Sequence, residues 1–396
     1  MIWDSLEPEL QALDQEGLTR RRRLVQSPVA PEMVVDGQKV LAFCSNDYLG
    51  LASHPEIARA MAEGALHWGA GAGASHLVSG HLEPHHRLEE ALAAFVGQDR
   101  ALYFSTGYMA NLAMIPALVG RGDGVFADKL NHASLIDAVQ LSRAHSHRYR
   151  HQDLAHLESL LAKSEAPRKL IVSDTIFSMD GDAAPLAELQ ALADKYDAWL
   201  VIDDAHGFGV AGPQGRGSVA ALALPPSPRR LYMGTLGKAA GVSGAFVAGH
   251  TTVMEWLLQK ARPYIFTTAS SPAVACALLK SLELIEAGDA RRQHLAALIG
   301  QLRQGLAPLC ASTGWQLMDS ATPIQPLVVG SNQDALALTE GLLAQGIWVP
   351  AIRPPTVPQG QARLRITLCA SHTPAQVEAL IGALEKLASR PGKGRP

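Results

Sequence analysis

The residues best suited to chemistry gather in one stretch of the sequence, residues 199–244. The short apolar run Trp199 to Ile202 is followed at once by acidic residues and a histidine, and a lysine lies further along in a glycine-rich turn. The side chains concerned are Asp203, Asp204, His206, Thr235 and Lys238. An apolar run of this length bounded by turn residues predicts a buried strand of a parallel sheet, and ligands bind at the carboxyl ends of such strands. We therefore expect these side chains at one ligand-binding edge of a sheet.

Lys238 has almost no side-chain bulk beside it, because its neighbours are Gly237, Ala239, Ala240 and Gly241, and no acidic residue adjoins it in sequence. An amine in such a place can approach a flat cofactor closely and form a Schiff base with it. The alternative is a solvated lysine on a surface turn.

Asp203 directly follows the apolar run, where a carboxylate is costly unless a cation pairs with it. The protonated pyridine nitrogen of pyridoxal 5'-phosphate (PLP) is such a cation. The alternative is that Asp203 or Asp204 caps the next helix.

The combination D-D-A-H-G followed by T-L-G-K-A resembles the PLP-dependent α-oxoamine synthases, a branch of the fold-type-I aminotransferase superfamily. The resemblance implies that Asp203 pairs with the pyridine nitrogen and that His206 approaches the phenolic oxygen of the cofactor. It also implies that Thr235 binds the phosphate and that Lys238 forms the Schiff base. Leu236 stands where the family usually has phenylalanine, which keeps an apolar residue there.

Further motifs of the family occur in the same order along the chain, namely S-N-D-Y-L-G at 45–50, G-Y-M-A-N at 107–111, D-K-L-N-H-A-S at 128–134 and F-S-M-D-G-D at 177–182. The first residues of the second motif, Gly107 and Tyr108, lie where a turn enters a helix, and a helix N-terminus binds anions such as the cofactor phosphate. The resemblance implies that His132 stacks on the pyridine ring and that Ser178 lies against the cofactor. If the resemblance is set aside, Gly107 and Tyr108 lie in a turn that binds no ligand, His132 is a polar residue with its hydrogen bonds satisfied, and Ser178 caps a turn.

Thr268 matches a hydroxyl that family members offer to the phosphate of the neighbouring subunit, so the resemblance implies a homodimer with a shared active site. Lys238, His132 and Asp203 are its implied catalytic residues. His132 is expected to help polarise the thioester oxygen of the acyl substrate.

Three arginines, Arg353, Arg363 and Arg365, lie in the segment 351–368 without an acidic residue among them. Guanidinium groups bind carboxylates strongly, although surface arginines paired with neighbouring acids are the alternative. The resemblance implies that Arg365 holds the carboxylate of an amino acid and that Asn46 and Thr356 contact substrate.

The N-terminal run Arg20 to Arg23 is either a solvated cluster at a helix end or a carboxylate site. The resemblance selects Arg20 as a contact of the acyl substrate, with Arg21 and Arg22 left as alternatives.

The form I-R-P-P-T-V-P-Q-G-Q-A-R-L-R most resembles the family branch that joins L-alanine to a pimeloyl thioester, carried on coenzyme A or acyl-carrier protein, in biotin biosynthesis. A sibling synthase that uses glycine or another acyl thioester is the alternative within the family. A catalytically silent scaffold subunit with this fold is also possible, but it would be expected to lack the lysine.

Strands that alternate with helices predict an α/β fold with a doubly wound, mostly parallel sheet, and the resemblance implies the fold-type-I PLP transferase architecture. We expect a large PLP-binding domain over 46–285 and a smaller α+β domain built from 286–396 and 1–45. The N-terminal part is expected to hold an amphipathic helix over 5–24 and a hairpin turn at Asp36-Gly37. Helices are expected over 87–96 and from Pro272 to about residue 306.

Composition excludes several other classes. The 396-residue chain has a net charge of −3 and an ordinary globular balance, which gives no general affinity for nucleic acid or anionic membranes. The four cysteines form no C-x-x-C pair, and the histidines at 81, 85 and 86 lack metal-site spacing, so we predict no metal. The glycine-rich run at 69–80 has no phosphate-loop lysine. No long apolar run or signal peptide is recognised, which favours a cytoplasmic enzyme.

Overall fold

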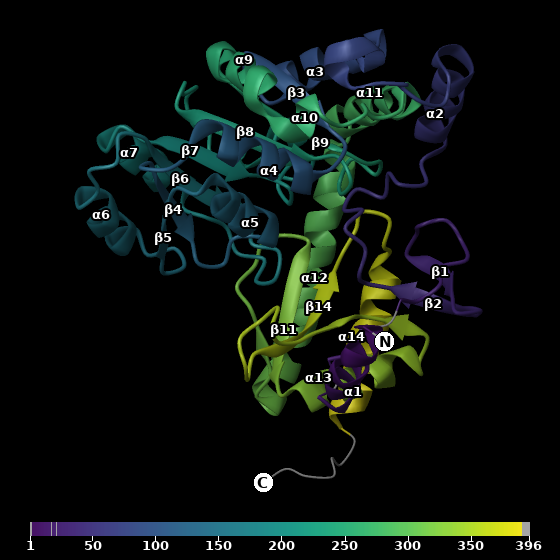
Figure 1. Cartoon of the computed structure of the whole chain (residues 1–396). Coiled ribbons are helices and arrows are strands. Elements are labelled where there is room, and N and C mark those ends of the chain that lie inside the picture. The colour runs from purple at the N-terminus through teal and green to yellow at the C-terminus, as the bar shows by residue number, and fades with distance from the viewer. Residues whose placement is uncertain (1, 17, 21, 390–396) are drawn as a thin grey trace.

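The computed structural model describes residues 2–16, 18–20 and 22–389. Figure 1 shows a large α/β part in the upper half and a smaller part below it, with the long helix α12 between them. The large part is built on seven strands in the order β3-β9-β8-β7-β6-β4-β5. Their bounds are β3 Arg100–Phe104, β4 Gly124–Asp128, β5 His145–Tyr149, β6 Lys169–Asp174, β7 Trp199–Asp203, β8 Arg230–Thr235 and β9 Ala245–Gly249.

The strands from β8 to β5 pair in parallel, while β9 runs antiparallel to both β3 and β8. Register places Asp174 at the end of β6 opposite Asp203 at the end of β7. The carboxyl ends of the central strands therefore meet at one edge, as the sequence predicts.

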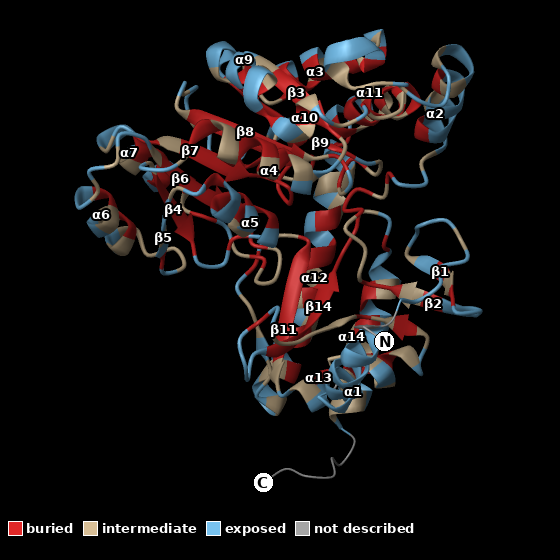
Figure 2. Cartoon of the chain, in the orientation of Figure 1, coloured by how far each residue is buried: buried red, intermediate tan, exposed pale blue. Residues whose placement is uncertain are grey.

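Helices cover both faces of this sheet. Neighbouring residues of one strand divide between two cores: Ile202 packs into one and Val201 into the other. Both faces are buried (Figure 2), which explains why the strands read as continuous apolar runs. The helices are α2 Pro55–Trp68, α3 Glu83–Phe95, α4 Gly107–Leu118, α5 Ala133–Ser142, α6 Leu154–Ala162, α7 Leu186–Lys195, α8 Ser218–Ala221, α9 Thr251–Lys260, α10 Arg262–Ile265 and α11 Pro272–Glu286, with the short turns η2 His76–Gly80 and η3 Pro213–Gly215.

The smaller part combines both ends of the chain. Its four-stranded sheet has the order β10-β11-β14-β13, and the N-terminal hairpin β1-β2 pairs with β12 in a second sheet. The predicted turn is confirmed, because Asp36 and Gly37 join β1 to β2 with positive φ angles of 51° and 79°. The elements are η1 Ile2–Ser5, α1 Leu6–Gln15, β1 Glu32–Val35, β2 Gln38–Ala42, α12 Asp289–Thr313, β10 Gln316–Leu317, β11 Ile324–Gly330, α13 Asn332–Leu343, β12 Ile347–Trp348, β13 Ala351–Ile352, β14 Ala362–Thr367 and α14 Pro374–Ala388. Domain boundaries at 45/46 and 285/286 stay predictions.

Three helix predictions are wrong in detail. The N-terminal helix α1 ends at Gln15, and none of its described residues is buried, because no other element packs on its leucines. The helix expected from Pro272 is two helices that break at Gly288, where glycine weakens helix propagation. Helix α3 begins at Glu83, with Pro84 in the first turn, a position that suits proline. No helix in the described ranges is long and apolar enough to span a membrane.

Candidate active site

Lys238 lies in the loop after β8, and its Nζ atom is 2.8 Å from Nε2 of His206. The loop lies against residues 51 and 52 because Gly241 adopts a φ of 69°, and a Cβ there would meet the backbone nitrogen of Ala52 at 2.5 Å. Burial lowers the pKa of Lys238 to about 8, and Asp203 and Asp174 oppose that shift. Arg365 also lowers this pKa, but burial contributes more than Arg365 does. A substantial fraction of this amine is therefore neutral near pH 8.

Asp203 is 3 % exposed and ends β7. Its Oδ2 atom accepts a hydrogen bond from Nδ2 of Asn111 at 2.8 Å, and its Oδ1 atom accepts one from the backbone nitrogen of Ala205 at 3.0 Å. Among the described residues it forms no ion pair within 4.0 Å. A buried carboxylate held by only two neutral donors suits a cationic ligand.

Asp204 has a different role, since the protein itself satisfies it. Its carboxylate accepts hydrogen bonds from the hydroxyl of Tyr232 at 2.6 Å, from the backbone nitrogen of Ser218 at 2.9 Å and from the hydroxyls of Ser218 and Thr175. Ser218 is the first residue of α8, so the helix-capping alternative applies to Asp204.

His132 precedes α5 at the same edge of the sheet. Its backbone nitrogen donates to Oδ2 of Asp174 at 2.7 Å, and its Nδ1 atom lies 2.8 Å from the hydroxyl of Ser134. Burial lowers its pKa, which keeps the imidazole neutral, although Asp203 opposes this shift. The ring is thus fixed at its backbone and at one nitrogen, as a stacking residue requires.

Gly107 and Thr235 border the N-terminus of α4. A Cβ on Gly107 would lie 3.7 Å from Oγ1 of Thr235, and one on Gly237 would lie 4.0 Å from the same atom, so small residues leave space around this hydroxyl. The hydroxyl donates to the backbone oxygen of Gly244 at 3.3 Å. A helix N-terminus with a hydroxyl beside it can hold a phosphate. Tyr108 lies on the first turn of α4, is 42 % exposed and donates its hydroxyl to Asp137.

Arg365 brings the smaller part of the chain to this edge. Its Nε atom donates to the backbone oxygen of Ser178 at 2.6 Å, and its Nη1 atom donates to Oδ1 of Asn46 at 3.3 Å and to the hydroxyl of Thr367 at 3.0 Å. It is 7 % exposed and forms no ion pair with the described residues. The nearby Arg363, in contrast, is paired with Asp180. Arg365 is therefore the arginine suited to an external carboxylate.

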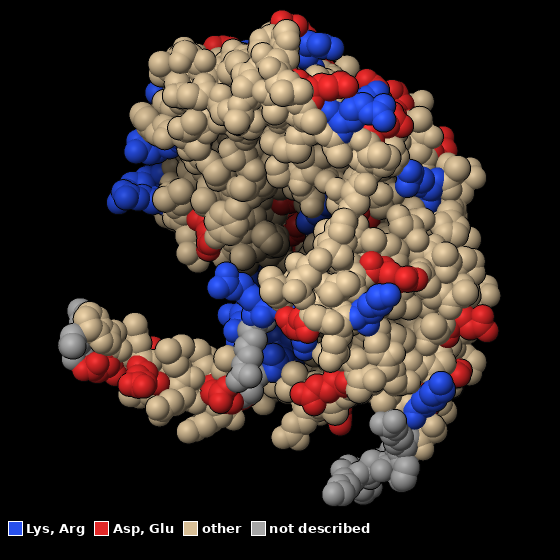
Figure 3. Space-filling model, turned by 90° about the vertical axis from the view of Figure 1, so that its right-hand side faces the viewer, with Lys and Arg blue, Asp and Glu red and all other residues tan. Residues whose placement is uncertain are grey.

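Arg20 and Thr356 line a separate cavity of about 540 Å³, together with Leu13, Leu18 and Arg353. Figure 3 shows a deep hollow in one side of the molecule, with basic side chains at its lower edge. Neither residue shares a described hydrogen bond with Lys238 or Asp203, and the alternative Arg21 lies outside the described residues. Thr268 is exposed and forms an isolated antiparallel β-bridge with Ser75.

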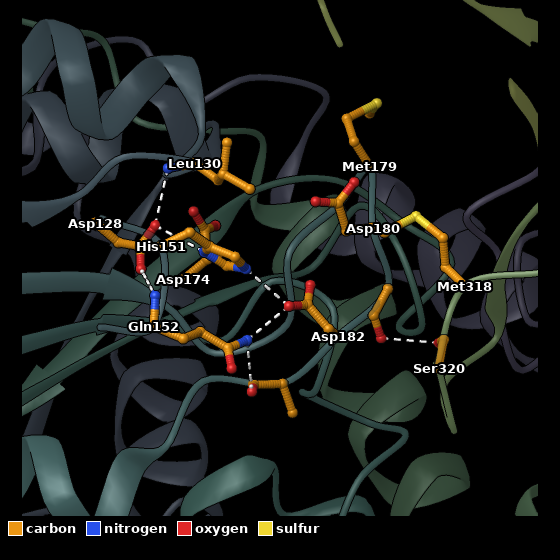
Figure 4. A network of polar contacts seen from close by, with 12 residues as sticks. Asp128, Leu130, His151, Gln152, Asp174, Met179, Asp180, Asp182, Met318 and Ser320 are labelled. Atoms are coloured by element: carbon orange, nitrogen blue, oxygen red, sulfur yellow. Dashed lines mark hydrogen bonds and ion pairs between the residues drawn. The ribbon is translucent and has the colours of Figure 1, made fainter. Parts of the chain in front are cut away.

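The loop that carries Ser178 is clamped from two sides (Figure 4). Asp182 contacts His151 and Gln152 of the large part, while the backbone oxygen of Gly181 accepts a hydrogen bond from Ser320 of the smaller part at 2.8 Å. Ser178 is thus held where both parts of the chain meet.

His151 lies between two carboxylates, with Nδ1 2.9 Å from Asp128 and Nε2 2.8 Å from Asp182. Burial alone would lower its pKa, but these hydrogen bonds and charges raise it to about 10. His151, Asp180 and Asp182 are close enough to share a metal ion. Both nitrogens of the His151 ring already contact carboxylates, so its two hydrogen bonds hold it in place within the protein.

We expect the stabilisation from His151 to fade with rising pH. Its folded pKa of about 10 exceeds the unfolded value of 6.5, so its contribution is complete below pH 6.5 and is lost as pH rises towards 10. Urea unfolding should show His151→Gln to be less stable than the wild type by about 2 kcal/mol at pH 6, and this difference should shrink by pH 9.5. The same change at His147 on β5 is the control. A difference that stays constant with pH would contradict the charged clamp.

Sequence reasoning missed three polar residues of this site. Asn111 donates to both Asp203 and the hydroxyl of Ser134, and its Oδ1 atom is buried without a hydrogen-bond partner. Asp174 anchors His132, and Tyr48 contacts His206 at 2.5 Å. Tyr48 and Asn111 lie within the motifs S-N-D-Y-L-G and G-Y-M-A-N, and Asp174 ends an apolar strand as Asp203 does. The sequence therefore contained a feature that could have marked each of them as a site residue.

Comparison with known proteins identifies the family. The aminotransferase class I and II family matches residues 38–384. Curated proteins named 8-amino-7-oxononanoate synthase from Herminiimonas arsenicoxydans and Aromatoleum aromaticum are each 61% identical to the chain; the alignments cover 97% and 98% of this chain and 99% of each relative. The chain belongs to the PLP-dependent α-oxoamine synthase family.

Solved structures agree with this family and with the predicted fold-type-I architecture. A serine palmitoyltransferase from Sphingomonas wittichii is 32% identical with a TM-score of 0.90, and the match covers 98% of this chain and 97% of that one. The 8-amino-7-oxononanoate synthase from Francisella tularensis is 30% identical with a TM-score of 0.75, over 88% and 97% of the two chains.

PLP is the cofactor of this α-oxoamine synthase, and the residues present fit it. Within the described part of the chain, Lys238 and Asp203 form no ion pair. This half-buried amine, this buried carboxylate and the small-residue cradle at the start of α4 are complementary to the aldehyde, the pyridinium and the phosphate of PLP. Which individual residues contact the cofactor stays a prediction for Gly107, Tyr108, Ser178, His206, Thr235 and Thr268, as it does for His132, Asp203 and Lys238.

Proposed function

We propose that the chain catalyses the decarboxylative condensation of L-alanine with a pimeloyl thioester, as 8-amino-7-oxononanoate synthases do. The observation that carries this proposal is the 61% identity over nearly the whole length to curated proteins of that name. The enzyme is thus a PLP-dependent acyltransferase of biotin biosynthesis.

The reaction forms one carbon–carbon bond and breaks three bonds, namely the Cα–H bond, the thioester C–S bond and the bond from Cα to the carboxylate, and new S–H and Cα–H bonds complete the balance. Cα of alanine loses a proton and bonds to the thioester carbonyl carbon, the thiol leaves, the former alanine carboxylate leaves as carbon dioxide, and a proton returns to Cα. When bound, PLP withdraws electrons from Cα of the amino acid.

Lys238 accepts the Cα proton as a general base, and its pKa of about 8 suits that task near neutral pH. Asp203 stabilises positive charge on the pyridine nitrogen, and His132 orients the ring and polarises the thioester oxygen. Arg365 fixes the alanine carboxylate with its Nη2 atom, which has no hydrogen bond among the described residues, and Asn46 supports this arginine.

The cavity that Arg20 and Thr356 share receives the acyl substrate in this proposal. Its apolar residues Leu13 and Leu18 suit methylene groups, and the guanidinium of Arg20 suits a carboxylate or phosphate. We also propose that the enzyme is a cytoplasmic homodimer, in which exposed Thr268 reaches the phosphate of the neighbouring subunit.

A synthase for a longer acyl chain is the second candidate, because serine palmitoyltransferases give TM-scores of 0.90. A TM-score compares backbones, however, whereas side chains select substrates, and the sequence identity to that enzyme is 32%. The test offers the holoenzyme alanine, glycine or serine with pimeloyl-CoA or palmitoyl-CoA and measures release of thiol and carbon dioxide. We expect alanine with pimeloyl-CoA to give the fastest turnover by at least about tenfold. Faster turnover with serine and palmitoyl-CoA would overturn the proposal.

A further inference from the structure

A continuous chain of hydrogen-bonding groups links Lys238 to Arg365. Nζ of Lys238 lies 2.8 Å from Nε2 of His206, and Nδ1 of His206 lies 2.5 Å from the hydroxyl of Tyr48. That hydroxyl donates to Oδ1 of Asn46 at 3.2 Å, and the same Oδ1 atom accepts Nη1 of Arg365 at 3.3 Å. Tyr48 is fully buried at the centre of this chain, so water does not compete for its hydroxyl.

The two central groups stay neutral. Burial raises the pKa of Tyr48 to about 12, so its hydroxyl keeps its proton. Burial, with Lys238 and Arg365 adding to the effect, lowers the pKa of His206 well below its ordinary value, so the imidazole carries one proton. That single proton is either on Nδ1 or on Nε2.

The charge on Lys238 determines which nitrogen carries the proton. An ammonium group only donates, so Nε2 of His206 must then accept, and Nδ1–H donates to the oxygen of Tyr48. The Tyr48 hydroxyl is then free to donate to Asn46. A neutral amine can accept from Nε2–H instead; in that case Nδ1 accepts the Tyr48 proton, and Asn46 loses that donor.

We propose that Tyr48 is a positioning residue that couples the charge of the free Lys238 amine to the Asn46–Arg365 pair. The coupling acts when this amine is free and in contact with His206, as in the apoenzyme. A bound cofactor, whose phenolic oxygen His206 is expected to approach, replaces that contact. The consequence of the coupling for alanine rests on the proposed function, in which Arg365 holds the alanine carboxylate. The other titratable groups around Lys238, namely Asp203, Asp174 and His132, lie outside the relay and keep their contacts in a Tyr48 variant.

The proposal predicts the direction of a pKa change. Arg365 also interacts with the Tyr48 hydroxyl. Within the relay itself, this hydroxyl makes two hydrogen bonds, to His206 and Asn46, when Lys238 is charged and one when it is neutral, so its removal costs the charged state more. Tyr48→Phe should therefore lower the pKa of Lys238 by about 0.5–1 units. Tyr103→Phe is the matched control, since Tyr103 is equally buried and has no described hydrogen bond to any member of the relay.

The rate at which the apoenzyme takes up PLP covalently, followed against pH by absorbance, reports this pKa because only the neutral amine reacts. We expect a lower midpoint for Tyr48→Phe and an unchanged one for Tyr103→Phe. In the holoenzyme, Tyr48→Phe should raise the KM for alanine about threefold or more while kcat changes less, since Arg365 loses support. An unchanged midpoint would overturn the relay.

A second measurement needs no variant. Nitrogen-15 NMR of histidine-labelled wild-type apoenzyme should show the His206 proton on Nδ1 at pH 6.5 and on Nε2 at pH 10. A single tautomer across that range would overturn the relay even if Tyr48→Phe failed to fold. If the wild type condenses alanine normally in that case, the proposed function stands without the relay.

Discussion

Replacement of Lys238 by alanine is expected to reduce turnover by at least about a thousandfold. In the proposed function this amine binds the cofactor covalently and then accepts the Cα proton, and its low pKa keeps part of it neutral. The variant should still fold and bind PLP without a covalent bond, because it leaves unchanged Gly107 and Thr235, the residues predicted to hold the phosphate. Release of thiol from pimeloyl-CoA measures turnover, and the visible spectrum measures the covalent bond.

The matched control is Lys195→Ala, which removes an exposed lysine that pairs with Glu158. It should leave turnover within about twofold of the wild type, because exposed ion pairs contribute little. Added methylamine should partly restore turnover to Lys238→Ala by supplying a small base. Normal turnover of Lys238→Ala without an added amine would show that another residue carries the chemistry.

Asp203→Asn is expected to lower kcat by about 10²–10³-fold. The amide can still accept from Asn111 but carries no negative charge, so it no longer favours a protonated pyridine nitrogen. The electron-withdrawing power of the cofactor falls most at the stage when charge develops at Cα. The KM for alanine should change little, since the proposed function places Arg365, and not Asp203, at the alanine carboxylate.

Asp204→Asn is a demanding control, because the two carboxylates are adjacent in sequence and equally buried. Asp204 is held by Tyr232, Ser218 and Thr175, so its loss should lower stability and leave the absorbance maximum of bound PLP unchanged. Asp203→Asn should move that maximum. A shift in the Asp204 variant alone would reverse the assignment of the two aspartates.

Much of the large sheet was predictable from sequence. The run that ends in Asp203 is apolar at every position because both faces of its strand are covered, and a carboxylate after such a run is an unusual feature that indicates a partner. Asp174 also ends an apolar strand, but none of the roles that the family resemblance implies falls on it. Positions such as Lys238, where the proposed role requires one residue type, are therefore the easiest to single out from the sequence.

Contacts between distant segments were not predictable. Tyr48 and His206 are separated by 158 positions, and only the folded chain brings the N-terminal motif against the loop after β7. The leucines of α1 have helical spacing, but spacing does not reveal whether another element packs on them, and here none of the described residues buries them. His151, held between two carboxylates, was also missed, since Asp128 ends β4 and Asp182 lies in the loop after β6.

The most direct test is to find the lysine that carries the cofactor. Purified enzyme with bound PLP is treated with borohydride, which makes the carbon–nitrogen bond permanent, and is then digested and mapped by mass spectrometry. We predict a reduced pyridoxyl phosphate on the peptide that contains Lys238 and on no other peptide. A modified lysine elsewhere, or a protein that binds no PLP, would contradict the account.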